Sequence, residues 1–441
     1  MIRLKKWMLA IVLLLAFTVL AACSDSNDGS ADATAPPSED NDTPAYTGGE
    51  ATIMIADVNT GIATNKEWVE QFFIQPVQEK FPEITVTMAP DSVQNMIKAG
   101  TPPDIVLVSN PYLHDYVELD LPEDLTEMIS KYNVDLGAFE QVVIEEIRRL
   151  SDGGIYGLPF SMNYGTTIYN KDIFDRFGVE YPKDGMTWDE HYELARSLTR
   201  VDDGVQYYGL RVPGLSEWLR QYTVPIVNPE TNQAELTTQA FIDVVAMLTK
   251  FYTIPGYTKD GNIGPTGDPF FKEQNTAMNP TWIAAGLNGL KNDNAYELFN
   301  WDLTTFPTLP DKPNVGKQVD FHMAVVNKAS PNREAAYQLV LSIISEEVQS
   351  GLSRVGRLTP LNNEHIRGLF GSDTNIFEGK NLQGVFSVEP APMPYISKFN
   401  SQIEGMLNGE TMRKIVIDQV DINSALREAE ERANTEFIIE D

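Results

Sequence analysis

The sequence predicts an exported α/β protein with two folded domains. Strand and helix patterns alternate from residue 51 onward, 42% of the 441 residues are hydrophobic, and a basic and then apolar segment stands at the N-terminus. A single hydrophobic core rarely grows beyond about 250–300 residues, so the region from residue 51 to residue 441 is expected to divide in two.

The N-terminal segment has the layout of a signal peptide. Basic residues among the first six precede an uncharged apolar run from Trp7 to Ala22, which is shorter than the roughly twenty residues that span a bilayer. The run ends in Leu20-Ala21-Ala22-Cys23, which resembles a bacterial lipobox. The resemblance implies a lipid on Cys23 and cleavage before it, with the protein anchored to the extracellular face of the cell membrane. An ordinary signal peptide or a short anchor helix is the alternative.

The segment from residue 23 to residue 50 is predicted to be a disordered acidic linker, because it is rich in small polar residues and has neither Lys nor Arg. Cys23 is the only cysteine, so the folded region is expected to have no disulfide. A formal charge of -30 disfavours nucleic acid as a partner, since nucleic acids reward clusters of Lys and Arg.

The first folded residues show a βαβαβ pattern. Residues 52–56, 84–88 and 104–108 have strand patterns, and residues 65–80 and 93–99 have helix patterns between them. Parallel strands joined by helices predict a parallel sheet covered by helices.

Later elements are predicted from their boundary residues. Thr187 and Glu190 have the spacing of a capping box for a helix that runs to Leu198, and Ser330 is expected to cap another helix with Pro331 at its first position. A strand is expected at residues 209–212, and the last helix is expected to begin after Asp421.

Catalytic and metal-binding motifs are not found. The histidines are far apart in sequence, no nucleophile-elbow, dinucleotide or P-loop motif occurs, and residues 260–264 do not continue as a calcium loop. No cofactor and no metal are therefore expected. A glycosidase or lyase would need only two carboxylates or a base, so a carbohydrate-active enzyme stays open as an alternative.

Three segments stand in a recognisable order: Tyr156-Gly157-Leu158-Pro159, then residues 168–174, then Thr187-Trp188-Asp189-Glu190. Together they resemble the signature of family 1 extracellular solute-binding proteins, the sugar-binding components of ABC importers related to maltose-binding protein. Further segments follow in the order that the family shows: residues 101–105, 271–278, 306–310, 332–336 and 422–434. Glu273-Gln274-Asn275 departs from the pattern, because the family usually has a glycine there.

The resemblance implies a two-lobe fold of the type II periplasmic-binding-protein kind, with crossing strands and a ligand cleft between the lobes. Residues 51–161 with about 327–375 would form lobe 1, and about 163–320 with about 390–441 would form lobe 2. The lobes would close on a ligand, and the transmembrane subunits of an ABC permease would recognise the closed form. A monomer is expected.

Two tryptophans are the candidate stacking platforms for a sugar, because sugars present apolar C–H faces that pack on aromatic rings. The resemblance favours Trp282, which follows residues 277–278, and then Trp218 with Glu217 beside it. Trp188 and Trp301 are interpreted as structural.

Polar candidates follow two predicted strands. Asp57, Asn59 and Thr60 leave the first strand, and Asn110 and Tyr112 leave the third. Ligands in open α/β sheets gather at the carboxyl ends of strands, so these positions are plausible without any resemblance.

The crossings supply the remaining candidates. Asn163 and Tyr164 lie at the first crossing, where the resemblance implies a hydrogen-bonding side chain. Tyr395 and Phe399 near the third crossing could form a further wall of the site or serve only in helix packing.

The sequence therefore predicts a lipid-anchored surface protein that captures a carbohydrate, with an oligosaccharide favoured, and passes it to a permease without chemical change. A binding protein for another small solute such as a polyamine, a secreted carbohydrate-active enzyme and a sensory module are the alternatives.

Overall fold

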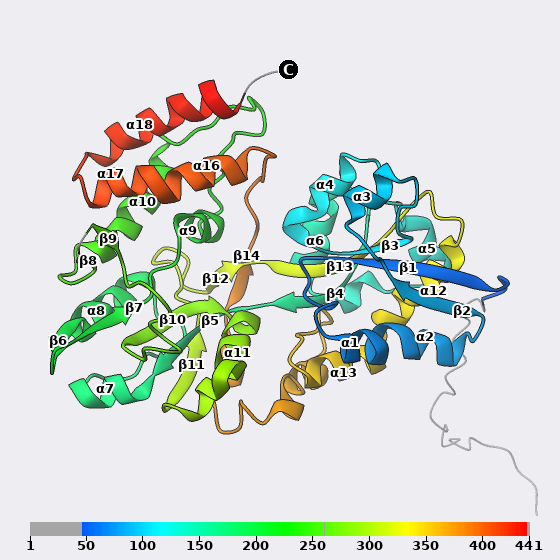
Figure 1. Cartoon of the computed structure of the whole chain (residues 1–441), viewed down its shortest axis with the longest axis horizontal. Coiled ribbons are helices and arrows are strands. Elements are labelled where there is room, and N and C mark those ends of the chain that lie inside the picture. The colour runs from blue at the N-terminus through cyan, green and yellow to red at the C-terminus, as the bar shows by residue number, and fades with distance from the viewer. Residues whose placement is uncertain (1–45, 260, 439–441) are drawn as a thin grey trace, which may run out of the picture. The chain divides into compact units, whose positions relative to one another are not determined.

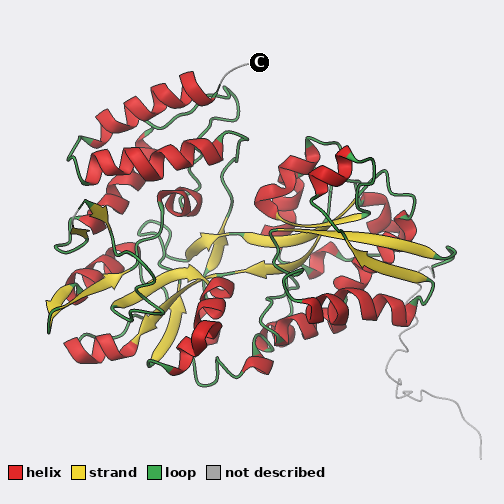
Figure 2. Cartoon of the chain, in the orientation of Figure 1, coloured by secondary structure: helices red, strands yellow, loops and turns green. Residues whose placement is uncertain are grey.

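The computed structural model of the chain describes residues 46–259 and 261–438, so the predicted signal peptide, Cys23 and most of the acidic linker lie outside the described residues. The described part contains two five-stranded sheets, each flanked by helices (Figures 1 and 2). The predicted α/β fold of two lobes is confirmed. Within these residues no helix combines the length and the apolarity needed to cross a membrane.

The sheet of the first lobe has the order β2-β1-β3-β13-β4. Strands β1 (Ala51–Val58), β2 (Ile84–Met88) and β3 (Ile105–Ser109) are parallel, as the βαβαβ pattern predicts. Strand β13 (Asp320–Val326) then runs antiparallel to both β3 and β4 (Leu158–Asn163). β3 is buried along its whole length, as its continuous apolar run predicts for a strand covered on both faces.

The predicted helix at residues 65–80 is interrupted by a π-helical turn. Its parts are α1 (Lys66–Trp68), the π turn Val69–Ile74 and α2 (Gln75–Lys80). Pro76 cannot donate a backbone hydrogen bond to the preceding turn, which accounts for the interruption. Asn65 begins the helix as predicted, since its Oδ1 accepts from the backbone of Glu67 at 3.1 Å. The next helix, α3, spans Val93–Lys98.

The sheet of the second lobe has the order β11-β5-β10-β7-β6. The antiparallel neighbours of β5 are β10 and β11, and β7 is parallel to β10. The strand predicted at residues 209–212 lies earlier in the chain, as β7. The strand bounds are β5 Gly165–Asn170, β6 Arg200–Asp202, β7 Val205–Leu210, β10 Thr276–Trp282 and β11 Trp301–Thr305.

Helices of the second lobe include two with confirmed caps. Thr187 and Glu190 form the predicted capping box of α8 (Trp188–Leu198), and Asp421 caps α18 (Ile422–Arg432). Other helices of this lobe are α7 (Lys171–Phe177), α9 (Leu215–Gln221), α10 (Gln239–Tyr252), α11 (Ile283–Lys291) and α16 (Asn400–Met406).

The chain passes from one sheet to the other through very short segments. Only Tyr164 separates β4 from β5, and only Val319 separates β12 (Val315–Gln318) from β13. β12 pairs in parallel with β14 (Glu389–Ala391), which adds a small two-stranded sheet at this junction.

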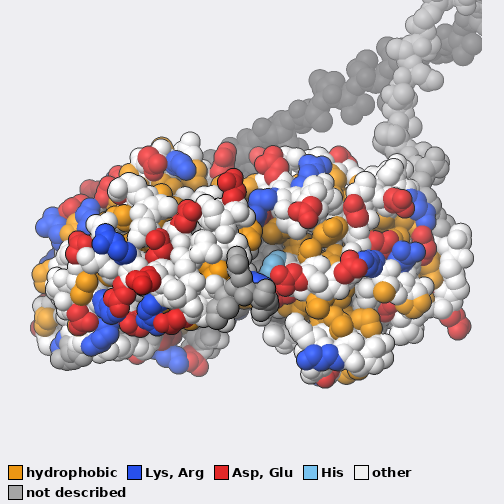
Figure 3. Space-filling view, turned by 90° about the horizontal axis from the view of Figure 1, so that it is seen from above, with side chains coloured by type: hydrophobic (Ala, Val, Ile, Leu, Met, Phe, Trp, Pro, Cys, Tyr) orange, Lys and Arg blue, Asp and Glu red, His pale blue; other side chains and the backbone are white. Residues whose placement is uncertain are grey.

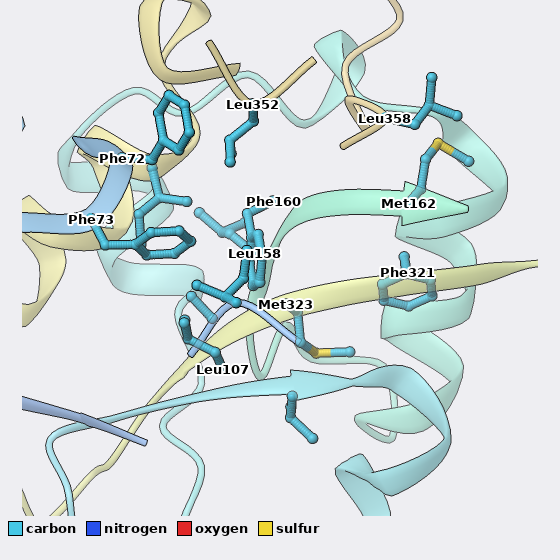
Figure 4. Packing of buried hydrophobic residues seen from close by; sticks show 14 of the residues in the cluster. Phe72, Phe73, Leu107, Leu158, Phe160, Met162, Phe321, Met323, Leu352 and Leu358 are labelled. Atoms are coloured by element: carbon cyan, nitrogen blue, oxygen red, sulfur yellow. The ribbon is translucent and has the colours of Figure 1, made fainter. Parts of the chain in front are cut away.

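Aromatic and aliphatic side chains from several elements form the core of the first lobe. Phe72 and Phe73 from the interrupted helix point toward Phe160 of β4 and Leu352 of α13 (Glu346–Arg354), as Figure 4 shows. Phe73 and Phe160 meet edge to face with ring centroids 5.6 Å apart. This hydrophobic cluster continues into α11, so α11 is held from the first lobe's side as well as by its own sheet.

The predicted helix start at Ser330 is wrong. Helix α12 spans Arg333–Ile343 and is preceded by Asn332. The hydroxyl of Ser330 donates instead to the buried carboxylate of Asp104, which also accepts from the backbone of Met54 at 2.8 Å. The Oγ of Ser330 also accepts from the backbone N–H of Asn332 at 3.0 Å, so these bonds hold Ser330 in the turn that precedes the helix.

Candidate ligand site

A cavity of about 900 Å³ is lined by residues of both lobes. The first lobe contributes the loop after β1 together with α1, and the second lobe contributes one side of α11. A volume of this size is typical of small-molecule sites. We call it the cleft cavity; its lining residues include Asn59, Thr60, Lys66, Glu67, Trp68, Ala284, Asn288, Lys291, His322 and Arg357.

A second cavity, of about 680 Å³, adjoins the first and shares Asn59 and Lys66 with it. It lies within the first lobe at the carboxyl ends of β1 and β2, where ligands of open α/β sheets gather. We call it the first-lobe cavity. Its charged lining is mainly acidic, from Asp57, Glu70 and Asp91.

Asp57 fixes the loop that borders both cavities. Its carboxylate accepts hydrogen bonds from the backbone and hydroxyl of Thr60 at 3.0 and 2.6 Å and from the backbone of Ala63 at 2.7 Å. Asn59 has a φ of 60°, a left-handed conformation that Asn tolerates better than most residues. The predicted residues Asn59 and Thr60 therefore line the cleft cavity, while Asp57 positions them.

Trp68 and Arg357 form a cation–π pair in the wall of the cleft cavity. The guanidinium carbon of Arg357 lies 5.4 Å from the Trp68 ring centroid, and its Nη1 donates to the carbonyl of Thr60 at 2.9 Å. Burial lowers the pKa of Arg357, and the nearby charge of Asp57 opposes that effect. Neither residue was predicted for the site: no local pattern marks Arg357, and Trp68 lies within the predicted helix at residues 65–80.

His322 lies beside this pair in the same cavity. Its Nδ1 is 2.9 Å from the hydroxyl of Ser161. Burial, with the positive charge of Arg357, lowers the pKa of His322 to about 3, so its ring is neutral at physiological pH.

Trp282 and Glu217 lie in another cluster, around the ammonium of Lys317. The Nζ of Lys317 is 4.6 Å from the Trp282 ring centroid and 4.7 Å from that of Phe306, and it forms an ion pair with Glu217. Lys317 is 2% exposed, and burial lowers its pKa while the Glu217 carboxylate opposes the shift. Neither Trp282 nor Glu217 lines the cleft cavity or the first-lobe cavity.

The prediction that Trp218 is a stacking platform is wrong. It is 1% exposed, its ring stacks on that of Trp188 with centroids 4.0 Å apart, and its Nε1 donates to the carbonyl of Pro213 at 3.2 Å. Both faces and the polar atom are thus used in the core of the second lobe. Trp188 and Trp301 are buried structural residues, as predicted.

Asn163 and Tyr164 lie at the first crossing, outside the two cavities. The amide of Asn163 donates to Asp320 and accepts from the backbone of Ala284, both at 3.3 Å. Tyr164 is 7% exposed and meets Phe386 edge to face at 5.3 Å, and burial raises its pKa to about 12. The contacts of Tyr164 are those of a packing residue.

The remaining candidates are divided between a third cavity and the surface. Asn110 and Tyr395 line a cavity of about 240 Å³, whereas Tyr112 is 43% exposed. Asn110 accepts from the backbone of Phe321 at 3.2 Å, but its buried Nδ2 finds no acceptor among the described residues. Such a donor is unusual in a folded protein, so Asn110 stays a ligand candidate.

The described residues include no group of three or more His, Cys, Asp or Glu side chains that could hold a metal ion. The candidate site is therefore a cavity with aromatic, amide, hydroxyl and cationic groups, shared by two lobes that are joined by short crossings. This arrangement defines a two-lobe binding protein.

The chain belongs to the bacterial extracellular solute-binding proteins, whose family model matches residues 59–350. The family consists of binding proteins and not of enzymes. Among curated proteins, a candidate periplasmic-binding protein of an ABC transporter from Escherichia coli K12 is 25% identical over 174 residues, which are 36% of this chain and 38% of that protein. The chain thus matches less than half of that relative's length.

Solved structures of the same fold cover more of the chain. A sugar transporter protein from Rhizobium etli has a TM-score of 0.69 and 21% identity, over 87% of this chain and 99% of its own. A substrate-binding protein from Listeria monocytogenes, solved in complex with cycloalternan, has a TM-score of 0.66 and 20% identity, over 87% and 98%.

Proposed function

We propose that this protein is the extracellular solute-binding lipoprotein of an ABC importer and that it captures a carbohydrate, with an oligosaccharide favoured. The observation that carries the proposal is the cleft cavity, to which both lobes contribute and in which Trp68 is set among fixed polar groups. An aromatic ring with fixed donors and acceptors suits the C–H faces and the hydroxyls of a sugar.

An oligosaccharide is favoured by the size of the site. The two cavities meet at Asn59 and Lys66, so a ligand longer than one sugar ring could extend from one into the other. The cycloalternan complex of the Listeria protein of the same fold supports this size class. A polyamine is disfavoured, because Lys66, Lys291 and Arg357 would repel it from the cleft cavity.

Ligand capture would couple to transport through the two lobes. A ligand that contacts the β1 loop and α11 together stabilises the arrangement in which both lobes engage it, and the permease would recognise that arrangement. The protein would act as a monomer and leave the ligand chemically unchanged.

Thermal shift against a panel of neutral oligosaccharides, monosaccharides, polyols and polyamines tests the solute class, since a ligand that binds only the folded state raises the melting temperature. We expect oligosaccharides to give the largest shift and Trp68→Ala to reduce it. Tyr112→Ala, on an exposed ring outside the cavity, is the control. A shift with polyamines alone would refute the proposed solute class.

The location of the protein is a separate part of the proposal. Lipid on Cys23 would hold the protein at the outer face of the membrane, and the acidic linker would set its reach. Cells fed labelled palmitate should yield labelled protein in the membrane fraction, and Cys23→Ser should abolish both the label and the membrane association. Label retained by Cys23→Ser would contradict the anchor.

A further inference from the structure

The charges in the cleft cavity have the opposite sign to the charge of the whole protein. The chain has a formal net charge of -30, yet the charged residues of this cavity are Lys66, Lys291 and Arg357 against the single carboxylate of Glu67. Acidic and basic side chains are interspersed over the face that Figure 3 shows, so a grouping of cations is not a general feature of the surface.

None of these three cations has a carboxylate within ion-pair distance among the described residues. Arginines elsewhere in the described chain commonly do, as in the pair of Arg220 with Glu404 at 3.0 Å. Lys66 and Lys291 are exposed at the edges of the cavity, one from each lobe. A group that contacts both would therefore bridge the lobes.

Arg357 is the most restricted of the three. Its guanidinium has one hydrogen bond, to the Thr60 carbonyl at 2.9 Å, and the Trp68 ring holds it from one side. The nearby Asp57 does not form an ion pair with it; the Asp57 carboxylate accepts instead from three donors of Thr60 and Ala63. Guanidinium groups bind carboxylates and other oxyanions through two parallel hydrogen bonds.

The backbone beside Arg357 leaves room for the guanidinium. Gly61 has a φ of 73°, and a Cβ at this position would lie 3.2 Å from Nη2 of Arg357. The glycine thus permits both the left-handed turn and the close approach of the guanidinium.

We propose that the cleft cavity selects an anionic saccharide, one that carries a carboxylate or sulfate group, and that Arg357 binds this group with help from Lys66 and Lys291. The inference rests on the proposed carbohydrate function and specifies its substrate class. The acidic lining of the first-lobe cavity gives the ligand a direction: the anionic group lies at Arg357, and the uncharged part extends past Asn59.

Titration calorimetry on the purified protein tests the inference with matched disaccharides. The probes are digalacturonate, its methyl ester, the neutral galactobiose and a sulfated galactobiose. We expect the charged disaccharides to bind at least about tenfold more tightly than the neutral ones, with a ratio that shrinks as salt increases. Comparison of digalacturonate with the sulfated probe identifies the anionic group.

Variants assign the effect to the cavity. Arg357→Gln should remove most of the charged-to-neutral ratio while the neutral disaccharide still binds, and Lys291→Gln should reduce the ratio by a smaller factor. Arg354→Gln, an exposed arginine on α13 outside the cavity, should leave it unchanged. If Arg357→Gln does not fold, two other measurements test the anionic class. The charged-to-neutral affinity ratio of the unmodified protein should shrink as salt increases, and Lys291→Gln should reduce that ratio.

The failures of the two proposals are distinguishable. Equal binding of charged and neutral disaccharides, or a ratio that Lys291→Gln and Arg357→Gln leave unchanged, would overturn the anionic class and leave the carbohydrate function standing. Absence of binding to every saccharide, charged or neutral, would overturn both.

Discussion

Glu217 and Lys317 should contribute unequally to stability although they form one ion pair. The ammonium side chain of Lys317 is 0% exposed, whereas the side chain of Glu217 is 36% exposed. Removal of Glu217 leaves a buried cation without its partner, while removal of Lys317 leaves a carboxylate that water can reach. Breaking a buried pair by deleting one partner costs about 3–5 kcal/mol when the remaining charge is fully buried.

We therefore expect Glu217→Gln to lower the free energy of unfolding by about 2–3 kcal/mol, below that range because the aromatic faces of Trp282 and Phe306 still stabilise the ammonium. Lys317→Met should cost about 1 kcal/mol or less, because it removes the buried charge and keeps a similar volume. Lys250→Met is the control, since its pair with Asp189 is exposed and worth about 0–1 kcal/mol. Urea unfolding followed by tryptophan fluorescence measures all three.

The pH dependence gives an independent check on the same cation. Burial lowers the pKa of Lys317 in the folded protein, and loss of Glu217 should lower it further. The unfolded chain then binds more protons than the folded one, so the deficit of Glu217→Gln should shrink as pH rises toward the ordinary lysine pKa of about 10.4. A Lys317→Met variant that is less stable than Glu217→Gln, or a deficit independent of pH from 7 to 10, would refute the reasoning.

Three further outcomes follow from buried groups and caps. Trp218→Ala should cost about 3–5 kcal/mol in urea unfolding, since it removes a ring stacked on Trp188 in a dense core, and a cost below 1 kcal/mol would contradict its placement there. Thr187→Ala should cost about 1 kcal/mol by loss of the capping box, while Thr249→Ala, at a half-buried position within α10, should change stability less. The pKa of His322 is about 3 in the folded protein, so on acidification the His322 ring of the unfolded chain takes up a proton first. His322 should therefore reduce the free energy of unfolding as pH falls below about 6.5. His322→Asn should weaken that pH dependence, and an identical pH profile would show that the ring is not held neutral.

Local patterns were sufficient to predict many elements, because those patterns act within a few residues. β2 matches the predicted residues 84–88, and the capping box of α8 and the cap of α18 are where the sequence indicates. The start of α12 was wrong because Ser330 is held in the turn before the helix, by its bond to the distant Asp104 and by its bond from the backbone of Asn332. A cap is a local preference of about 1 kcal/mol, whereas the Asp104 contact joins residues 226 positions apart and leaves no local pattern.

The candidate site was only partly predictable for the same reason. Asn59 and Thr60 were found because they follow a strand, and the carboxyl ends of parallel strands meet at one edge of a sheet. Arg357 reaches the cavity from a segment that is about 300 positions later in the chain, after α13 returns it to the first lobe. No spacing in the sequence connects it to Trp68.

Two of the cation–tryptophan pairs, those of Trp282 and Trp68, differ in whether the cation has a carboxylate partner. In both pairs a cation lies over an indole ring, at 4.6 Å for Lys317 on Trp282 and 5.4 Å for Arg357 on Trp68. Lys317 is already neutralised by Glu217, so a sugar could stack on that face of Trp282 only by displacing the buried ammonium from its ion pair. Arg357 has no carboxylate partner among the described residues and borders a cavity, so a ligand can complete its hydrogen bonding without first breaking a pair. Between these two indoles, the pairing of the cation and the adjoining cavity, more than the presence of the aromatic ring, favour Trp68 as the one placed to meet a solute.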